Sequence, residues 1–260
     1  MQLSAVTVCV SYSAALAACH GNAVHFDRWI VVTVPDDVAT QRWCAGAGVE
    51  YCVCFETQAG GFFFAAHHKG YFINTGLRQL RRSASQKRVA SDDWLLVLDA
   101  DTLMLSDFCE RLEALSPFLD RNKLYGLRGR RIAASPEVFT ALRRLEPWES
   151  ALERFSMVVG YFNLFHRNGP HRSYPKSDPD GTIHDDYRFY SLVGKANCAE
   201  LPMTALHLGQ TRVNWNGNGR EEDVTVHSEA WAQAARDDAW AVNDAASAMA
   251  STTHELKTRV

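Results

Sequence analysis

A run of five apolar residues that ends in two carboxylates constrains this chain more than any other feature. Residues 94–98 read Trp-Leu-Leu-Val-Leu, and Asp99 and Asp101 follow them. Such a run is typical of a strand buried on both faces of a parallel sheet. Because alternate side chains of a strand share a face, we expect the two carboxylates to lie on the same side.

This acidic pair predicts a cation site. Two neighbouring anions at the end of a buried strand repel each other unless a cation lies beside them. Open α/β sheets also bind their ligands at the carboxyl ends of their strands. We therefore predict a divalent-metal and nucleotide site at Asp99 and Asp101. The alternative is a solvated turn after a core strand, because Asp-x-Asp is a short motif that needs its structural context.

The composition fits a globular domain. The chain has 260 residues, of which 47% are hydrophobic, so a full core is expected and global disorder is not. A net charge of −3 gives no overall basic footprint, which argues against nucleic-acid binding through bulk charge alone. The seven cysteines are odd in number and lie mostly in apolar runs, as buried free thiols of a reducing compartment do.

The N-terminal region predicts neither export nor membrane insertion. Residues 16–19 read Leu-Ala-Ala-Cys, like a lipoprotein cleavage site, but residues 1–15 contain no Lys or Arg. No apolar run approaches the roughly 18 residues that a membrane span needs. We expect a cytoplasmic protein, of a bacterium or of a phage-infected host.

Strands and helices alternate along the first part of the chain. Strands are expected at residues 5–10, 29–34 and 49–55, and helices at 11–19 and from 38 to the glycines at 46 and 48. This alternation predicts an α/β fold with a parallel sheet and helices on its faces.

The rest of the chain predicts further elements. Helices are expected at residues 69–82, after Ser106, from Ser135-Pro136 and at 228–251. Strands are expected at 94–98, 123–127, 157–165 and 201–208, with a long loop at 166–184.

The order of these motifs resembles a known family. A strand followed by Asp36-Asp37, a Lys69-Gly70 helix, a strand ending in Asp-x-Asp, a Gly160-Tyr161-Phe162 strand, an acidic turn and His207-Leu208-Gly209 occur in sequence. This set resembles the nucleotide-sugar-dependent glycosyltransferases of the GT-A fold, closest to the family-2-like group of bacteria and phages. The resemblance implies one domain with a Rossmann-like, mostly parallel sheet. Its expected parts are a nucleotide-binding half at 1–105, an acceptor and catalytic half at 106–225, and a C-terminal helix and tail at 226–260.

The resemblance implies a bound Mn²⁺ or Mg²⁺ and a nucleotide-sugar donor, with a UDP-sugar as the first expectation. Asp101 would bind the metal directly, and Asp99 would contact the ribose or the metal through water. His207 resembles the third metal ligand, although a single His is more often a core or surface residue. Arg220, near Asn214-Trp215 in the sequence, could pair with the diphosphate, since guanidinium suits phosphate oxygens.

Residues after the second strand and in the next helix are candidate donor contacts. Asp36 and Asp37 lie where the fold reads the base and ribose, and helix capping is the alternative for either. Lys69 could reach the phosphates as a point charge, or lie solvated on the surface. Asn74 could face the same site.

An inverting sugar transfer needs a base that takes the proton of the acceptor hydroxyl. Asp185 and Asp186 end the long loop, and the family pattern of an acid three residues before an aromatic favours Asp186. A helix N-cap with solvated neighbours is the alternative reading of one of the two.

Three other functions compete with this one. The sequence Asp-Ala-Asp-Thr at 99–102 is similar to aspartyl-phosphate phosphohydrolases, but there the Thr lies four residues after the first Asp. A metal-dependent nucleotidyltransferase would need a Gly-rich basic loop after the first strand, where this chain has Ser-Tyr-Ser-Ala. A non-catalytic nucleotide-sugar-binding module would not need the acids at 185 and 186.

The acceptor is an open question at this stage. Basic residues cluster in two places, and solvated surface is the ordinary interpretation of such clusters. If they flank Asp99 and Asp101 they would suit a polyanion, so 5-hydroxymethylpyrimidine in phage DNA stands beside saccharide as acceptor. The clusters are Arg78, Arg81, Arg82, Lys87 and Arg88, and Arg128, Arg130 and Arg131.

Overall fold

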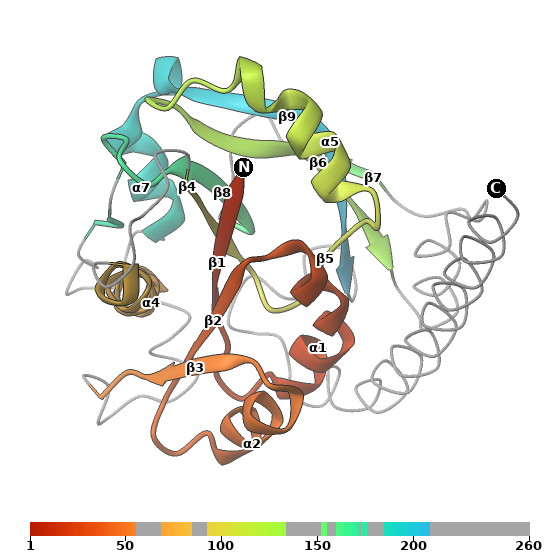
Figure 1. The fold of residues 1–260 in the computed structure, drawn as a ribbon, viewed down its shortest axis with the longest axis vertical. Helices are drawn as coiled ribbons and strands as arrows, with labels where there is room; N and C mark the ends of the chain where they lie inside the picture. The colour runs from red at the N-terminus through yellow and green to blue at the C-terminus, as the bar shows by residue number, and fades with distance from the viewer. Residues whose placement is uncertain are drawn as a thin grey trace, which may run out of the picture.

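The computed structural model describes residues 1–55, 69–84, 93–133, 152–154, 160–171, 173–175 and 185–208. Its N-terminal half is a parallel sheet in the order β3-β2-β1-β4 (Figure 1). β1 therefore lies between β2 and β4. β4 is the strand that leads to Asp99. The four strands are β1 (Gln2–Val8), β2 (Arg28–Thr33), β3 (Glu50–Val53) and β4 (Asp93–Leu98).

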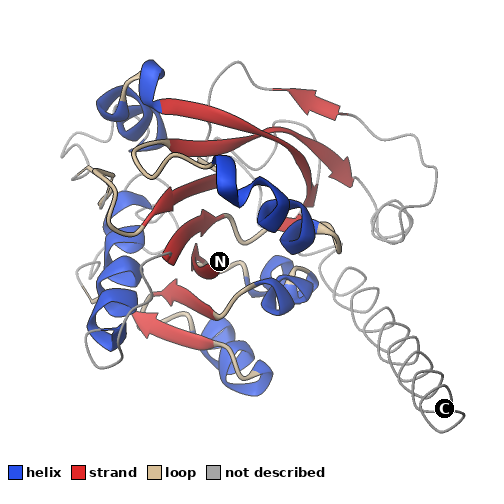
Figure 2. Ribbon diagram, turned by 45° about the horizontal axis from the view of Figure 1, so that its top comes forward, coloured by secondary structure: helices blue, strands red, loops and turns tan. Residues whose placement is uncertain are grey.

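Helices cover both faces of this parallel sheet (Figure 2). Along β4, Leu95 and Val97 belong to a core that includes α4 residues, whereas Leu96 and Leu98 pack in a second core with α1 and α2. This alternation is what burial of both faces requires, and it explains the continuous apolar run. The helices are α1 (Ser13–Ala18), η1 (His20–His25), α2 (Val38–Ala47) and α4 (Lys69–Ala84).

The second half of the sheet is mixed. β8 pairs antiparallel with β4, β6 follows antiparallel to β8 and parallel to β9, and β5 pairs antiparallel with β9. These strands are β5 (Thr102–Met104), β6 (Leu124–Ala133), β8 (Phe162–His166) and β9 (Cys198–Leu208), with β7 (Leu152–Arg154) beside β6. The helical elements here are α5 (Phe108–Leu115), η2 (Ser116–Phe118), α7 (Asp185–Val193) and η3 (Lys195–Asn197).

The predicted α/β class is confirmed: a Rossmann-like parallel half continues into a mixed half, with helices on both sides. Two local predictions also hold. Asp37 caps α2 through its side chain, and Gly48 ends that helix at a φ of 68°. Among the described helices none is long and apolar enough to cross a membrane. All seven cysteines are free, and four of them are buried.

Some local predictions differ from the structure. β1 begins at Gln2 and β6 runs to Ala133, because pairing with long neighbours extends both strands beyond their apolar runs. β5 and β7 have only three residues each and were too short to predict. The residue before α5 is Asp107 and not Ser106. The helices expected from Ser135 and at 228–251 lie outside the described residues.

Helix α4 approaches the sheet closely because of one glycine. A Cβ on Gly76 would lie 2.5 Å from a Val6 methyl carbon and 2.8 Å from one of Val32. Without it, the helix backbone rests directly on β1 and β2. This close packing fixes the N-terminal end of α4, where Lys69 is the first residue.

Candidate functional site

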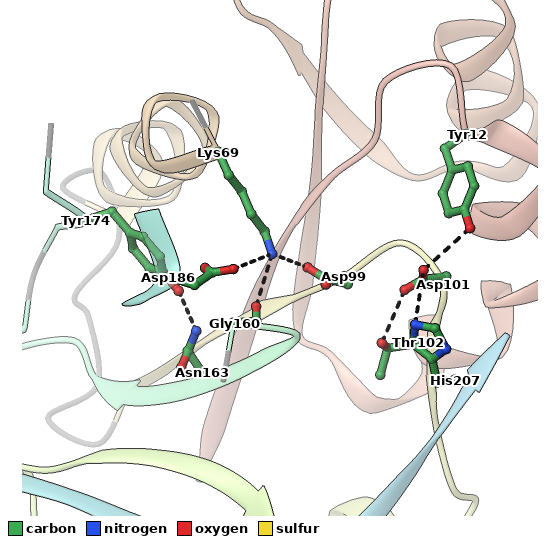
Figure 3. A network of polar contacts seen from close by, with 10 residues as sticks. All are labelled: Tyr12, Lys69, Asp99, Asp101, Thr102, Gly160, Asn163, Tyr174, Asp186 and His207. Atoms are coloured by element: carbon green, nitrogen blue, oxygen red, sulfur yellow. Dashed lines mark hydrogen bonds and ion pairs between the residues drawn. The ribbon is translucent and has the colours of Figure 1, made fainter. Parts of the chain in front are cut away.

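The two aspartates of the Asp-x-Asp motif lie in different surroundings (Figure 3). β4 ends at Leu98, and the amide of Thr102 donates to the carbonyl of Asp99 at 3.2 Å, so Asp99 to Thr102 form a turn. Strand alternation therefore does not extend to Asp101, so the physical reason for expecting a shared face does not apply there. Asp99 points to Lys69, whereas Asp101 points to Tyr12 and His207.

Lys69 connects three groups from distant parts of the chain. Its Nζ donates to Asp99 Oδ1 at 2.5 Å, to the Gly160 carbonyl at 3.2 Å and to Asp186 Oδ2 at 3.5 Å. The Lys69 side chain is 16% exposed, and those of Asp99 and Asp186 are 18% and 11% exposed. The end of β4, the start of β8 and the start of α7 thus meet at one ammonium (Figure 3).

Gly160 provides the space that Asp186 occupies. A Cβ on Gly160 would lie between 1.8 and 2.2 Å from the carboxyl carbon and oxygens of Asp186. The carboxylate therefore rests directly on the backbone before β8, in a position from which a Cβ on residue 160 would displace it. Its second oxygen, Oδ1, is buried and has no hydrogen-bond partner among the described residues. A buried polar atom of this kind ordinarily has a partner, so a bound molecule is expected to supply one.

Burial, together with an excess of negative charge, shifts the pKa values of Asp99 and Lys69. Burial raises the pKa of Asp99 to about 6; Lys69 opposes the rise, and Asp101 and Asp186 add to it. The pKa of Lys69 is also raised, since Asp186 and Asp99 outweigh the burial that disfavours its charge. Three carboxylates are thus close enough to influence one another around one ammonium. A further cation would relieve this repulsion.

Asp101 and His207 meet through strand pairing. Thr102 of β5 pairs with His207 of β9, and the amide of Leu208 donates to the Asp101 carbonyl at 2.9 Å. His207 Nε2 then lies 3.4 Å from Asp101 Oδ2. The imidazole is 1% exposed, and neither ring nitrogen has a hydrogen-bond partner among the described residues. The sequence prediction that Asp101 and His207 come together is consistent with this geometry.

These two residues fit a divalent cation. A carboxylate and an imidazole are ordinary ligands of Mn²⁺, and the unsatisfied imidazole nitrogens are what a metal-binding histidine offers. No third His, Cys, Asp or Glu joins them closely enough to form a metal-holding group in the described part of the chain. Cations that bind nucleotides take one or two protein carboxylates and complete their shell with phosphate oxygens and water. Asp101 and His207 therefore suit a cation whose remaining ligands are water or the oxygens of a bound molecule.

The loop after β1 holds Asp101 from the other side. The Tyr12 hydroxyl donates to Asp101 Oδ2 at 3.5 Å, and Thr102 Oγ1 donates to Asp101 Oδ1 at 3.5 Å. Burial, and then the Asp101 charge, raise the pKa of Tyr12, so it stays a donor. Ser11 before it has a φ of 55°, and its amide donates to Asp37 Oδ2 at 2.8 Å. Backbone strain of this kind often occurs at functional sites.

The two acids after β2 differ. Asp37 is 7% exposed, and its carboxylate accepts from the Ser11 amide, the Thr33 hydroxyl and the Thr40 amide. It therefore caps α2 and holds the loop after β1. Asp36 is exposed, so its carboxylate is the one available to a base or ribose.

Asn74 holds a segment of the predicted long loop. Its amide donates to the Tyr174 carbonyl at 3.0 Å, and its oxygen accepts from the Tyr174 amide at 2.9 Å. The Tyr174 ring stacks on Phe189 with centroids 4.0 Å apart, and its hydroxyl accepts from Asn163 at 2.5 Å. Asn74 thus fixes the segment next to α7, on which Asp186 lies, and both ends of its side chain are used in doing so.

The remaining predicted residues are Asp185, those outside the described part of the chain, and the arginines of the second basic cluster. Asp185 begins α7, next to Asp186. Arg220, Lys87 and Arg88 lie outside the described residues. Arg130 is 3% exposed and its guanidinium lies 5.2 Å from the Tyr161 ring centre, so the interpretation of this arginine as solvated surface is wrong. The Tyr161 ring, which comes just before β8, supplies a flat aromatic face that shelters the charge.

Sequence reasoning missed two residues of the site. Tyr12 lies 89 positions from Asp101, and no local pattern connects them. Gly160 was noticed only as part of a motif, although a glycine before a buried strand is a signal of close backbone approach.

Comparisons with known proteins find likenesses of structure only. No family model and no curated protein matches the sequence. Among solved structures, glucosyl-3-phosphoglycerate synthase from Mycobacterium tuberculosis, in complex with Mn²⁺, UDP and glucosyl-3-phosphoglycerate, matches at 12% identity with a TM-score of 0.49, covering 89% of this chain and 80% of that one. A nucleotidyl transferase from Methanothermobacter thermautotroptrophicus matches at 10% identity and a TM-score of 0.45, covering 89% and 98%.

A 4-diphosphocytidyl-2C-methyl-D-erythritol synthase matches at 14% identity and a TM-score of 0.43, covering 87% of this chain and 96% of that one. The ligands of these enzymes belong to them, and the chemistry of this chain rests on its own side chains.

Proposed function

We propose that this protein is a metal-dependent glycosyltransferase that moves a sugar from a nucleotide-sugar, a UDP-sugar first, to a hydroxyl acceptor with inversion. The observation that carries the proposal is the placement of two unsatisfied groups at the end of β4. The buried His207 ring beside Asp101 offers nitrogen ligands, and the buried Asp186 carboxylate offers an oxygen without a partner. Lys69 and Asp99 join the two parts of the site.

The donor would be held through its diphosphate at Asp101 and His207. A divalent cation bound there would neutralise the charge that develops on the departing diphosphate. The exposed Asp36 carboxylate, near the start of α2, is the proposed contact of the base or ribose. Arg220, which the sequence places after β9, remains a proposed diphosphate contact.

Asp186 would act as the base. Its Oδ1 takes the proton of the acceptor hydroxyl while the acceptor oxygen forms a bond to the anomeric carbon. The bond between that carbon and the diphosphate oxygen breaks, and its electron pair leaves with the nucleoside diphosphate. The products are a glycosylated acceptor, a nucleoside diphosphate and a proton held by Asp186. Asp185, at the same helix end, is the second candidate for this role.

The test combines a donor panel with one substitution. The protein is incubated with nucleotide sugars and Mn²⁺, and release of nucleoside diphosphate is measured for the wild type and for Asp186→Asn. Lost release with retained UDP affinity supports an enzyme with Asp186 as base. Equal release from both proteins contradicts that role, and a protein that binds UDP but releases nothing from any donor is a binding module. Release of pyrophosphate from a nucleoside triphosphate identifies a nucleotidyltransferase instead.

The proposed acceptors are 5-hydroxymethylpyrimidine in phage-type DNA and saccharide. Two arginines of the basic clusters are candidates to contact DNA phosphates. Arg78 is exposed on α4, and Arg131 is half-buried on β6. Binding to hydroxymethylated duplex DNA should weaken steeply with salt if these charges contact phosphates. Absence of binding at low salt removes DNA as an acceptor.

A further inference from the structure

The Lys69 ammonium lies among acceptor groups of the protein itself. It donates to two carboxylates and one carbonyl, and these come from the ends of β4, β8 and α7. An ammonium has three N–H donors, and these protein acceptors are enough to occupy them. To contact a donor phosphate, Lys69 would have to give up at least one buried carboxylate, which is costly in a site of low dielectric.

The position of Lys69 suits a connecting role more than a ligand-binding one. Its backbone is fixed at the first residue of α4, whose close contact with β1 and β2 depends on Gly76. The Nζ lies between Asp99, which is two residues from the proposed metal ligand Asp101, and Asp186, the proposed base. Lys69 therefore links the turn that carries the proposed metal ligand to the proposed base.

We infer that Lys69 is a positioning residue that ties Asp186 to the Asp99 turn, and that it does not bind the phosphates of the donor. This inference rests on the proposed function for its kinetic consequence, and replaces the sequence expectation that Lys69 reaches the phosphates. The ammonium holds both carboxylates at a fixed separation while donor and acceptor bind. Without it the two acids repel each other, and Asp186 moves away from the position where an acceptor hydroxyl would meet it.

The experiment separates positioning from phosphate binding. Three variants are compared with the wild type: Lys69→Met, which keeps the apolar stem of the side chain and removes its charged end; Lys69→Arg, which keeps the charge; and Arg111→Met as a control. Arg111 is an exposed α5 residue paired with Asp107, so its loss removes one surface charge and one surface ion pair away from the site. Affinities for UDP and for uridine are measured by calorimetry with Mn²⁺, and turnover is measured as nucleoside diphosphate release.

Positioning predicts a split between turnover and donor binding. Lys69→Met should lower kcat by about 100-fold, the cost of roughly 1 Å of misplacement, with KM for the donor nearly unchanged. The ratio of UDP to uridine affinity should stay within about threefold of the wild type, since no phosphate contact is lost. Lys69→Arg should recover part of kcat, and Arg111→Met should match the wild type. A tenfold or larger fall of that ratio, or unchanged kcat, overturns the inference.

A structural readout keeps the inference testable if a variant folds poorly. In crystals of the wild type with UDP and Mn²⁺, Lys69 Nζ should remain within hydrogen-bond distance of Asp99 and Asp186. A contact from Nζ to a phosphate oxygen overturns the inference and leaves the proposed function standing. If the wild type binds UDP but releases no nucleoside diphosphate from any donor, the proposed function fails, and the affinity ratio and the crystal still decide the role of Lys69.

Discussion

Replacing Gly160 with alanine tests whether turnover needs the space that this glycine leaves for the Asp186 carboxylate. The new Cβ would lie 1.8 to 2.2 Å from the Asp186 carboxyl atoms, whereas non-bonded carbon atoms pack at roughly 3.5 Å. The carboxylate must therefore withdraw by about 1.5 Å, and its contact with Lys69, already at 3.5 Å, is lost. A misplacement of about 1 Å can cost about 100-fold in rate, so turnover of Gly160→Ala should fall at least that far.

The assay is nucleoside diphosphate release from the active donor, together with UDP affinity in the presence of Mn²⁺. Affinity should be unchanged, because Asp101 and His207 are not in contact with the substituted position. Gly46→Ala is the matched control: nothing lies within 4 Å of its added Cβ, so it should keep full turnover. Wild-type turnover of the Gly160→Ala protein would refute the claim that catalysis needs Asp186 in this position.

The unfolding midpoint identifies the clash partner. Gly160→Ala should destabilise the wild type by about 1–3 kcal/mol, the usual cost of overpacking. In an Asp186→Ala background the same substitution should cost much less, because the carboxylate that it meets is gone. Equal destabilisation in both backgrounds would show that the clash is with other atoms.

Three further predictions concern packing, pH and the metal. Gly76→Ala should lower the free energy of unfolding by about 1–3 kcal/mol in denaturant titrations, because its Cβ would press on Val6 and Val32; an unchanged value would contradict the close packing of α4. Asp99 has its pKa raised to about 6, so the folded chain holds a proton that the unfolded chain releases at lower pH. Relative to Asp99→Asn, wild-type stability should therefore fall by on the order of 2–3 kcal/mol as pH rises from 4 to 6, and a rise would contradict the stated cause. His207→Ala should abolish the Mn²⁺ dependence of UDP binding in calorimetry, whereas an unaltered dependence would exclude this residue as a ligand.

Much of the fold follows from local sequence patterns. The runs that form β2 and β4 are apolar at every position because both faces of the parallel sheet are covered by helices. The start of α2 was predictable from Asp37 and its end from Gly48, since capping and left-handed backbone are properties of single residues. Short strands such as β5 were not, because three residues carry no period and form a strand only through pairing with β9.

The site was predictable in its residue types and less so in its arrangement. Asp101 and His207 were expected together from the resemblance, and pairing of Thr102 with His207 supplies the physical means. The separation of Asp99 from Asp101 could not be predicted, because it depends on β4 ending at Leu98 and turning. The partners of Lys69 could not be predicted, because they depend on long-range contacts. Asp99 and Asp186 lie 30 and 117 residues away from it in the chain.

The central claim is that a divalent cation binds between Asp101 and His207 together with a nucleoside diphosphate. Anomalous diffraction from crystals grown with Mn²⁺ and UDP measures this directly. We predict a manganese peak in contact with the Asp101 carboxylate and a His207 ring nitrogen, next to the diphosphate. A peak elsewhere, or bound UDP without manganese at these two residues, would contradict the account.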